Sequence, residues 1–118
     1  MKKVIFYSYP KCTTCRKALQ WLDQNNINYQ LIDIVKDPPS KKILELALIQ
    51  FSLDIKKIFN TRGKSYKSID IDILDLTKKR IFELLSNDGK LIKRPFLIIN
   101  ESKLILGFNE SEYIANLK

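Results

Sequence analysis

The sequence contains no histidine and only two cysteines, Cys12 and Cys15. A structural zinc site takes four ligands, most often Cys and His, so a site within one protomer would need carboxylates to complete it. Metal binding is therefore the weaker hypothesis for this pair. Two cysteines at this spacing fit a reducing compartment, where redox or metal chemistry is more common than a structural disulfide.

Long hydrophobic runs are also missing from the chain. A membrane-spanning helix needs roughly 18 or more consecutive apolar residues, and no stretch approaches that length. The apolar run Val4–Tyr9 follows Lys2 and Lys3, but it is short and Pro10 comes directly after it, which argues against a signal peptide. We expect no membrane span, no export and a cytoplasmic location.

Glycine and proline are scarce, with three and four residues in a chain of 118 that is 45% hydrophobic and 29% charged. This composition is typical of globular proteins, and the length fits one domain. No internal repeat, low-complexity segment or linker interrupts the sequence. We predict a single domain over residues 1–118 that is a monomer.

Positive charge is in excess, because 21 Lys and Arg face 13 Asp and Glu, giving a net charge of +8. Such a surface attracts anions, but no block of five like charges occurs, which is typical of lysines spread over solvated helix faces. The aromatic residues do not alternate with basic ones in a stacking motif. We therefore expect no sequence-specific binding of nucleic acid.

The first third of the chain predicts a strand, a helix and a second strand. The β-branched and aromatic run Val4–Tyr7 indicates a buried strand. From Thr13 to about Asn25, apolar residues recur at three- and four-residue spacing, as on one face of a helix. The stretch Tyr29–Val35 indicates another strand. This order is a βαβ unit.

The middle of the chain predicts a helical insert over about residues 40–90. Ser40 is suited to cap one amphipathic helix, and Thr77 a second that ends near Asn87. A shorter helix is expected over residues 54–59, ending near Arg62-Gly63. The stretch 68–76 fits a strand or a helix face equally well, and its type stays open.

The last third of the chain predicts a hairpin and a helix. The apolar runs Phe96–Ile99 and Leu104–Leu106 are joined by four polar residues, which is the pattern of a β-hairpin. A final helix carries Tyr113, Ile114 and Leu117. The whole chain is thus predicted to be α/β, with a βαβ unit, the helical insert and a ββα unit.

The Cys12-Thr13-Thr14-Cys15 motif lies at the predicted start of the first helix. Residues three apart share one side of a helix, so the two cysteines can reach the Cα separation of about 5.5 Å that a disulfide prefers. The helix N-terminus, helped by Lys11 and Arg16, stabilises a thiolate on Cys12. Cys12 is then the nucleophile, and the more shielded Cys15 resolves a mixed disulfide. Two buried cysteines without chemistry remain an alternative.

Several short segments of the chain form a recognisable set together with the predicted order of elements. They are Tyr9 to Ala18, Pro38-Pro39-Ser40, Phe59 to Gly63, Asp88 to Pro95 and Gly107-Phe108. With them the chain resembles, over essentially its whole length, the thioredoxin-like arsenate reductase family, which includes the Spx regulators and an uncharacterised reductase-like branch. The resemblance implies a thioredoxin-like fold, and it also implies that Pro95 is a cis-proline facing the active cysteine and that Arg94 points its guanidinium toward the site.

The classical arsenate reductases in this family use one cysteine to attack the oxyanion and arginines to hold it. Cys12 and Arg94 match that pattern, whereas Cys15 is an added thiol. Asn60 stands near the place of one of the arginines, with Arg62 two residues on, and the stretch 104–108 offers no further arginine. Arsenate reduction is accordingly kept as the third hypothesis.

The Spx regulators share the CxxC motif and use its disulfide as a switch while they bind the C-terminal domain of the RNA polymerase α-subunit. They resemble one another in having a glycine in the insert loop that touches the polymerase, where this chain has Phe51-Ser52-Leu53-Asp54. A redox-switched regulator of this kind is the alternative hypothesis. The run 54–61 is instead similar to the reductase-like branch.

The leading hypothesis is a thiol-disulfide oxidoreductase that uses a reversible Cys12–Cys15 disulfide, with Arg94 stabilising the thiolate or an anionic substrate group. It needs no bound cofactor, only an external thiol donor such as glutaredoxin, glutathione or thioredoxin. The predicted partner is thus a redox protein or a small thiol, and in the alternative the polymerase α-subunit. The residues expected to orient the substrate are Pro95, Arg62, Lys11 and Arg16.

Overall fold

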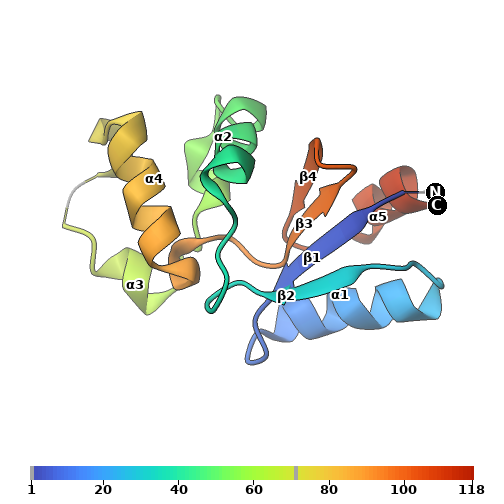
Figure 1. The fold of residues 1–118 in the computed structure, drawn as a ribbon. Coiled ribbons are helices and arrows are strands. Elements are labelled where there is room, and N and C mark those ends of the chain that lie inside the picture. Colours follow the sequence, from blue (N-terminus) through green and yellow to red (C-terminus); the bar gives the residue numbers. More distant parts are fainter. Residues whose placement is uncertain (1, 71) are drawn as a thin grey trace. The chain divides into compact units, whose positions relative to one another are not determined.

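The computed structural model describes residues 2–70 and 72–118, and they form two compact units, Met1–Asp33 with Arg94–Lys118 and Ile34–Lys93 (Figure 1). The first unit holds the cysteine motif, and the second contains the helical segment predicted for residues 40–90. The single-domain assignment stays a prediction. Within the described residues no helix has the length and apolar character that crossing a membrane requires.

The first unit has the predicted βαβ and ββα order. Its elements are β1 (Val4–Ser8), α1 (Thr13–Gln24), β2 (Gln30–Asp33), β3 (Phe96–Ile99), β4 (Lys103–Leu106) and α5 (Glu110–Leu117). The four strands form one sheet in the order β2-β1-β3-β4, in which β2 runs parallel to β1 while β3 and β4 are antiparallel to their neighbours. This sheet holds β1, and therefore the loop before α1, in the centre.

One face of the sheet is covered by α1 and α5. Alternate residues of a strand point to the same face, and those of β1, β3 and β4 pack with buried residues of both helices. The apolar spacing predicted for α1 is confirmed, because Cys15, Ala18 and Leu22 are buried. The shared core consists of Val4, Phe6, Ala18, Trp21, Leu22, Leu97, Ile99, Ile105, Tyr113 and Leu117.

The second strand is shorter than the predicted range 29–35. It pairs with β1 from Ile5↔Gln30 to Ser8↔Asp33. Because β1 itself ends at Ser8, residues beyond Asp33 have no strand to pair with, and the chain turns away there. The hairpin prediction holds as made, with β3 and β4 joined through Asn100 and Glu101, both at positive φ.

The second unit is helical, as predicted. Its elements are α2 (Lys41–Gln50), η1 (Ile55–Ile58), α3 (Lys64–Lys67), η2 (Ile73–Asp75), α4 (Lys78–Asn87) and η3 (Gly89–Leu91), where η marks a 3₁₀-helix. The two predicted N-caps are confirmed: the Ser40 hydroxyl accepts from the Ile43 N–H, and the Thr77 hydroxyl from the Arg80 N–H. These caps set where α2 and α4 begin.

Three details of the insert differ from the sequence prediction. The segment predicted as a short helix over 54–59 is the 3₁₀-helix η1, because Phe59 is extended and pairs with Ile92. Gly63 does not only end a segment, since it is also the N-cap of α3. In the stretch 68–76, Ile71 lies outside the described residues, and Asp72 caps the short turn η2. In each case, hydrogen bonds between nearby backbone and side-chain groups set the bounds of the element.

Candidate functional site

Cys12 is the N-cap residue of α1. Its backbone is extended, at φ −89° and ψ 114°, and its Sγ accepts a hydrogen bond from the Cys15 N–H at 3.3 Å. The turn before it is closed by the Cys12 N–H, which donates to the Tyr9 carbonyl at 3.0 Å. A cap normally offers an oxygen to the first free N–H groups of a helix. Here a sulfur takes that place, so a negative charge on it is stabilised.

Cys15 lies one turn further along α1 and is fully buried, whereas Cys12 is half-buried. Both thiols are free in this structure. The sulfur of Cys12 is therefore the more accessible one, and the sulfur of Cys15 lies behind it on the same side of the helix. The sequence predicted this greater shielding of Cys15, and the roles of nucleophile and resolving thiol stay a prediction.

The surroundings of Cys12 favour its thiolate. Burial by itself raises the pKa of Cys12, but hydrogen bonds from the Cys15 thiol and the Cys15 N–H, followed by a hydrogen bond and the positive charge of Arg94, outweigh it. The pKa of Cys12 consequently lies below its ordinary value. Since the thiolate is the reactive form of cysteine, this raises the reactivity of Cys12 near neutral pH.

Cys15 is shifted in the opposite direction. Burial, its hydrogen bond to Cys12 and the charge of the Cys12 thiolate raise the pKa of Cys15 to about 12, and hydrogen bonds with the Tyr9 backbone and the Ser8 side chain do not offset this. Cys15 thus keeps its proton more strongly than Cys12 does. The two thiols of one motif have unequal chemistry.

Arg94 and Pro95 precede β3, beside the cysteine motif. The peptide bond between them is cis, as the family resemblance implied. The Arg94 guanidinium lies over the Tyr9 ring, with its Cζ 4.7 Å from the ring centroid, which fits a cation–π contact. Its Nη1 is buried and has no hydrogen-bond partner among the described residues. The guanidinium thus acts on the Cys12 sulfur and keeps one donor nitrogen that the described residues do not use.

The side chains of the other residues predicted to orient the substrate, Lys11, Arg16 and Arg62, are not among the groups that lower the pKa of Cys12. Lys11 and Arg16 are exposed, and the Arg16 Nη2 donates to the Thr13 hydroxyl at 3.4 Å. Both side chains add positive charge around the loop before α1. Arg62 is exposed and belongs to the second unit, so its role toward Cys12 stays a prediction.

Two tyrosines near the motif were not assigned a role from the sequence. Tyr9 supports Arg94, and no spacing rule indicates a contact between residues so far apart in the chain. Tyr113 of α5 is fully buried, and its hydroxyl has no partner within the described part of the chain. Burial first, then the charges of Cys15 and Glu112, raise its pKa. The chain itself places Tyr9 next to the motif, but only the tertiary structure brings Arg94 over its ring and Tyr113 near Cys15.

Metal ligands do not gather in the described residues: no group of three or more His, Cys, Asp or Glu side chains is close enough there to hold an ion. The donors at the motif are two thiols, one guanidinium and backbone N–H groups. This set suits transfer of electrons between sulfur atoms and the holding of an anion.

Known proteins resemble the chain over most of its length. The model of the ArsC family matches residues 7–116. The uncharacterised protein YusI of Bacillus subtilis is 40% identical over 113 residues, which are 94% of this chain and 95% of YusI. The global transcriptional regulator Spx of Lactiplantibacillus plantarum is 33% identical and is covered to 82%, with 92% of this chain aligned.

The chain also resembles a solved structure. The crystal structure of a possible arsenate reductase from Streptococcus mutans has a TM-score of 0.84 and 37% identity, and the match covers 92% of this chain and 93% of that one. The predicted α/β, thioredoxin-like fold is thereby confirmed.

Proposed function

Because the chain belongs to the ArsC family, we propose that it is a thiol-disulfide oxidoreductase with Cys12 as nucleophile and Cys15 as resolving thiol. The observation that carries the proposal is the environment of the Cys12 sulfur. This sulfur caps α1 through the Cys15 N–H at 3.3 Å and has a lowered pKa, while the Cys15 thiol behind it keeps its proton. The opposite pKa shifts of the two thiols suit two different roles, one as the attacking and one as the resolving thiol.

The reaction proceeds in two exchanges. The Cys12 thiolate attacks one sulfur of a substrate disulfide, forms a mixed disulfide with it and releases the other sulfur as a thiolate. Cys15 then loses its proton and attacks the Cys12 sulfur, which closes the Cys12–Cys15 disulfide and expels the second substrate thiolate. Two electrons have moved from the protein to the substrate.

Arg94 acts on the charges of this reaction. Its hydrogen bond and charge stabilise the Cys12 thiolate, and the unpartnered Nη1 suits an anionic group of the substrate. Lys11 and Arg16 extend the positive field around the motif. Pro95 positions the substrate next to Cys12. We infer that the substrate carries a carboxylate or another anionic group near its disulfide.

An external thiol completes the cycle by reducing the Cys12–Cys15 disulfide. Glutathione, glutaredoxin and thioredoxin are the candidate donors, and no bound cofactor is required. These donors operate in the cytoplasm, which is where we place the protein.

Turnover tests the proposal. The protein is incubated with the mixed disulfide of glutathione and hydroxyethanethiol, with each donor in a separate reaction coupled to NADPH consumption. We expect consumption above the background rate of the donor itself with at least one donor, and only that background rate with Cys12→Ser. Background rates with all three donors would contradict an enzymatic role and leave the disulfide itself as a sensor.

A second function is favoured by a specific feature of the second unit. Leu53 is fully exposed, Leu74 is exposed by 63%, and both line one surface pocket. Exposed apolar side chains that gather at one place are typical of a protein contact. Together with the similarity to Spx, this feature supports a regulator that binds the C-terminal domain of the polymerase α-subunit. A pull-down with that domain that stays empty in both redox states would exclude it.

Arsenate reduction is the third candidate, carried by Cys12 and Arg94. The place of a further arginine is taken by Asn60, whose amide nitrogen donates to the Lys90 carbonyl at 3.4 Å. Loss of a charge-assisted contact costs about 1.5 to 3 kcal/mol. We therefore expect arsenate to oxidise a coupled thiol donor no faster than buffer does.

A further inference from the structure

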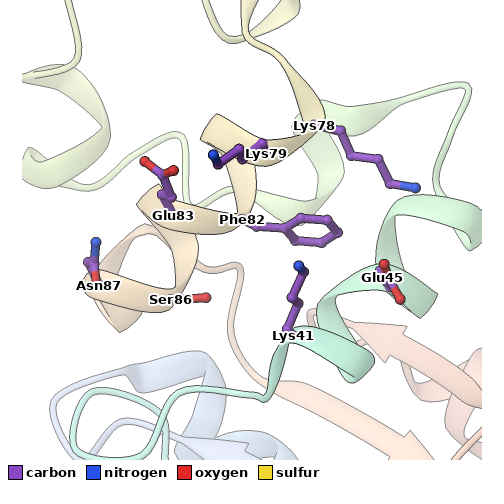
Figure 2. Close-up of a pocket in the computed structure, with 8 residues that line it drawn as sticks. All are labelled: Lys41, Glu45, Lys78, Lys79, Phe82, Glu83, Ser86 and Asn87. Atoms are coloured by element: carbon purple, nitrogen blue, oxygen red, sulfur yellow. The ribbon is translucent and has the colours of Figure 1, made fainter.

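Two lysines from different helices converge on one phenyl ring in the second unit. Lys41 is the first residue of α2 and Lys78 the first of α4. Their Nζ atoms lie 5.7 and 6.0 Å from the centroid of the Phe82 ring, at the outer limit of a cation–π contact of about 6 Å. Figure 2 shows both ammonium groups beside this ring.

The ring and the lysines line a pocket of about 540 Å³ that lies between α2 and α4. That volume falls within the range of roughly 300 to 1,000 Å³ usual for binding sites. Phe82 supplies an apolar wall, and Ser86 and Asn87 add polar atoms further along α4 (Figure 2). The pocket therefore offers both an apolar surface and charge.

Neither lysine is neutralised by the chain. In the described part of the structure, no carboxylate lies within ion-pair distance of the Lys41 or Lys78 ammonium. Glu83, which also lines the pocket, pairs with Arg80 at 3.1 Å. A negatively charged group in the pocket would meet two free ammonium groups.

The position of these lysines reinforces this preference. A helix N-terminus carries partial positive charge, so cations there are unfavourable and anions favourable. The first turns of α2 and α4 contain no acidic residue. An anion between Lys41 and Lys78 would be attracted by both ammonium groups and by the positive ends of the two capped helices.

The charge balance of the pocket limits what the anion can be. A third lysine, Lys79, also lines it, but so do Glu45 and Glu83. With two carboxylates in its lining, the pocket disfavours a highly charged group such as a polyphosphate. A single carboxylate next to an apolar group fits better.

We propose that this pocket binds an acidic, partly apolar segment of a partner protein. A carboxylate of the segment lies between Lys41 and Lys78, and an apolar side chain packs against Phe82. The proposal does not depend on the chemistry of Cys12, so each can fail without the other.

The test uses a fluorescently labelled synthetic helix that presents Glu and Leu at helical spacing, with a Gln-for-Glu version as its counterpart. Binding to wild type is compared with Lys41→Gln/Lys78→Gln and with the matched control Lys42→Gln/Lys90→Gln, which removes two exposed lysines outside the pocket. Both double variants have the same net charge, and all four lysines are exposed, so the fold is retained.

We expect saturable binding of the acidic peptide that the pocket variant weakens by about tenfold, as two partly exposed ion pairs allow, and that the control changes by less than about twofold. Amide shifts in the NMR spectrum should centre on Phe82, Ser86 and Asn87. Equal losses in both double variants, or equal affinity for the Gln peptide, would overturn the proposal.

Discussion

The cysteine motif and the pocket between α2 and α4 both place a cation against an aromatic ring, yet they suit different tasks. Arg94 lies 4.7 Å from the Tyr9 ring, closer than either lysine lies to Phe82. At the motif, the Cys15 thiol, the Cys15 N–H and the Arg94 guanidinium act on one sulfur. In the pocket, flexible ammonium groups surround an open space. The donors at the motif change the pKa of one reactive atom, whereas the lysines of the pocket attract a ligand.

The largest expected effect comes from removing the reactive atom of the first region. Cys12→Ser should abolish turnover and disulfide formation, because serine supplies neither the nucleophile nor a sulfur for Cys15. Cys15→Ser should keep the reactivity of Cys12 but stop at the mixed disulfide. Coupled thiol assays and intact mass measure both. A turnover rate in Cys12→Ser equal to wild type would remove the motif from the mechanism.

The second unit can be disrupted without touching the motif. A Cβ on Gly89 would lie 2.0 Å from the Ile34 carbonyl oxygen, so the backbone must shift. We expect Gly89→Ala to lower the free energy of unfolding by about 1 to 3 kcal/mol, measured by urea titration. Gly63→Ala is the control, because its Cβ would approach the Asn60 side-chain amide at 2.7 Å, which can move, and would meet the Asn60 carbonyl oxygen only at an ordinary contact distance of 3.5 Å. Equal effects of both changes would contradict the account.

Arg94→Met tests how far the guanidinium contributes to the lowered pKa of Cys12. Removing the guanidinium raises the pKa of Cys12, since Arg94 contributes to lowering it. Alkylation of Cys12 by iodoacetamide should slow by about tenfold at neutral pH, as the loss of a contact worth about 1.5 kcal/mol implies. Its pH midpoint should move upward, and the two rates should converge at high pH. Arg16→Met removes a charge from the same loop, but its guanidinium donates to Thr13 and is not among the groups that lower the pKa of Cys12, so the midpoint should move less than in Arg94→Met.

A smaller effect is expected at the start of α4, where the pocket begins. Thr77→Ala removes the hydroxyl that accepts from the Arg80 N–H at 3.2 Å, and loss of an N-cap costs about 1 kcal/mol. Thr77→Asp, which retains an acceptor, should restore most of the stability in thermal unfolding. No difference between Ala and Asp would mean that the cap does not hold this helix.

Periodicity and capping residues were enough to predict most elements from the sequence, including the caps at Ser40 and Thr77 and the helix that begins after Cys12. The errors lie where local hydrogen bonds decide, as in η1, which the pairing of Phe59 with Ile92 ends. Neither periodicity nor capping residues predict contacts between distant segments of the chain. The contact of Tyr9 with Arg94 and that of Lys41 with Phe82 form only because the fold brings such segments together.

The measurement that tests the central claim most directly is the mass of the Cys12–Cys15 peptide after mild oxidation of the wild-type protein. We predict the loss of two hydrogen atoms, reversed by a dithiol. After exposure of Cys15→Ser to oxidised glutathione, we predict one glutathione on Cys12. Two free thiols after oxidation, or a wild-type adduct found on Cys15 in place of Cys12, would contradict the account.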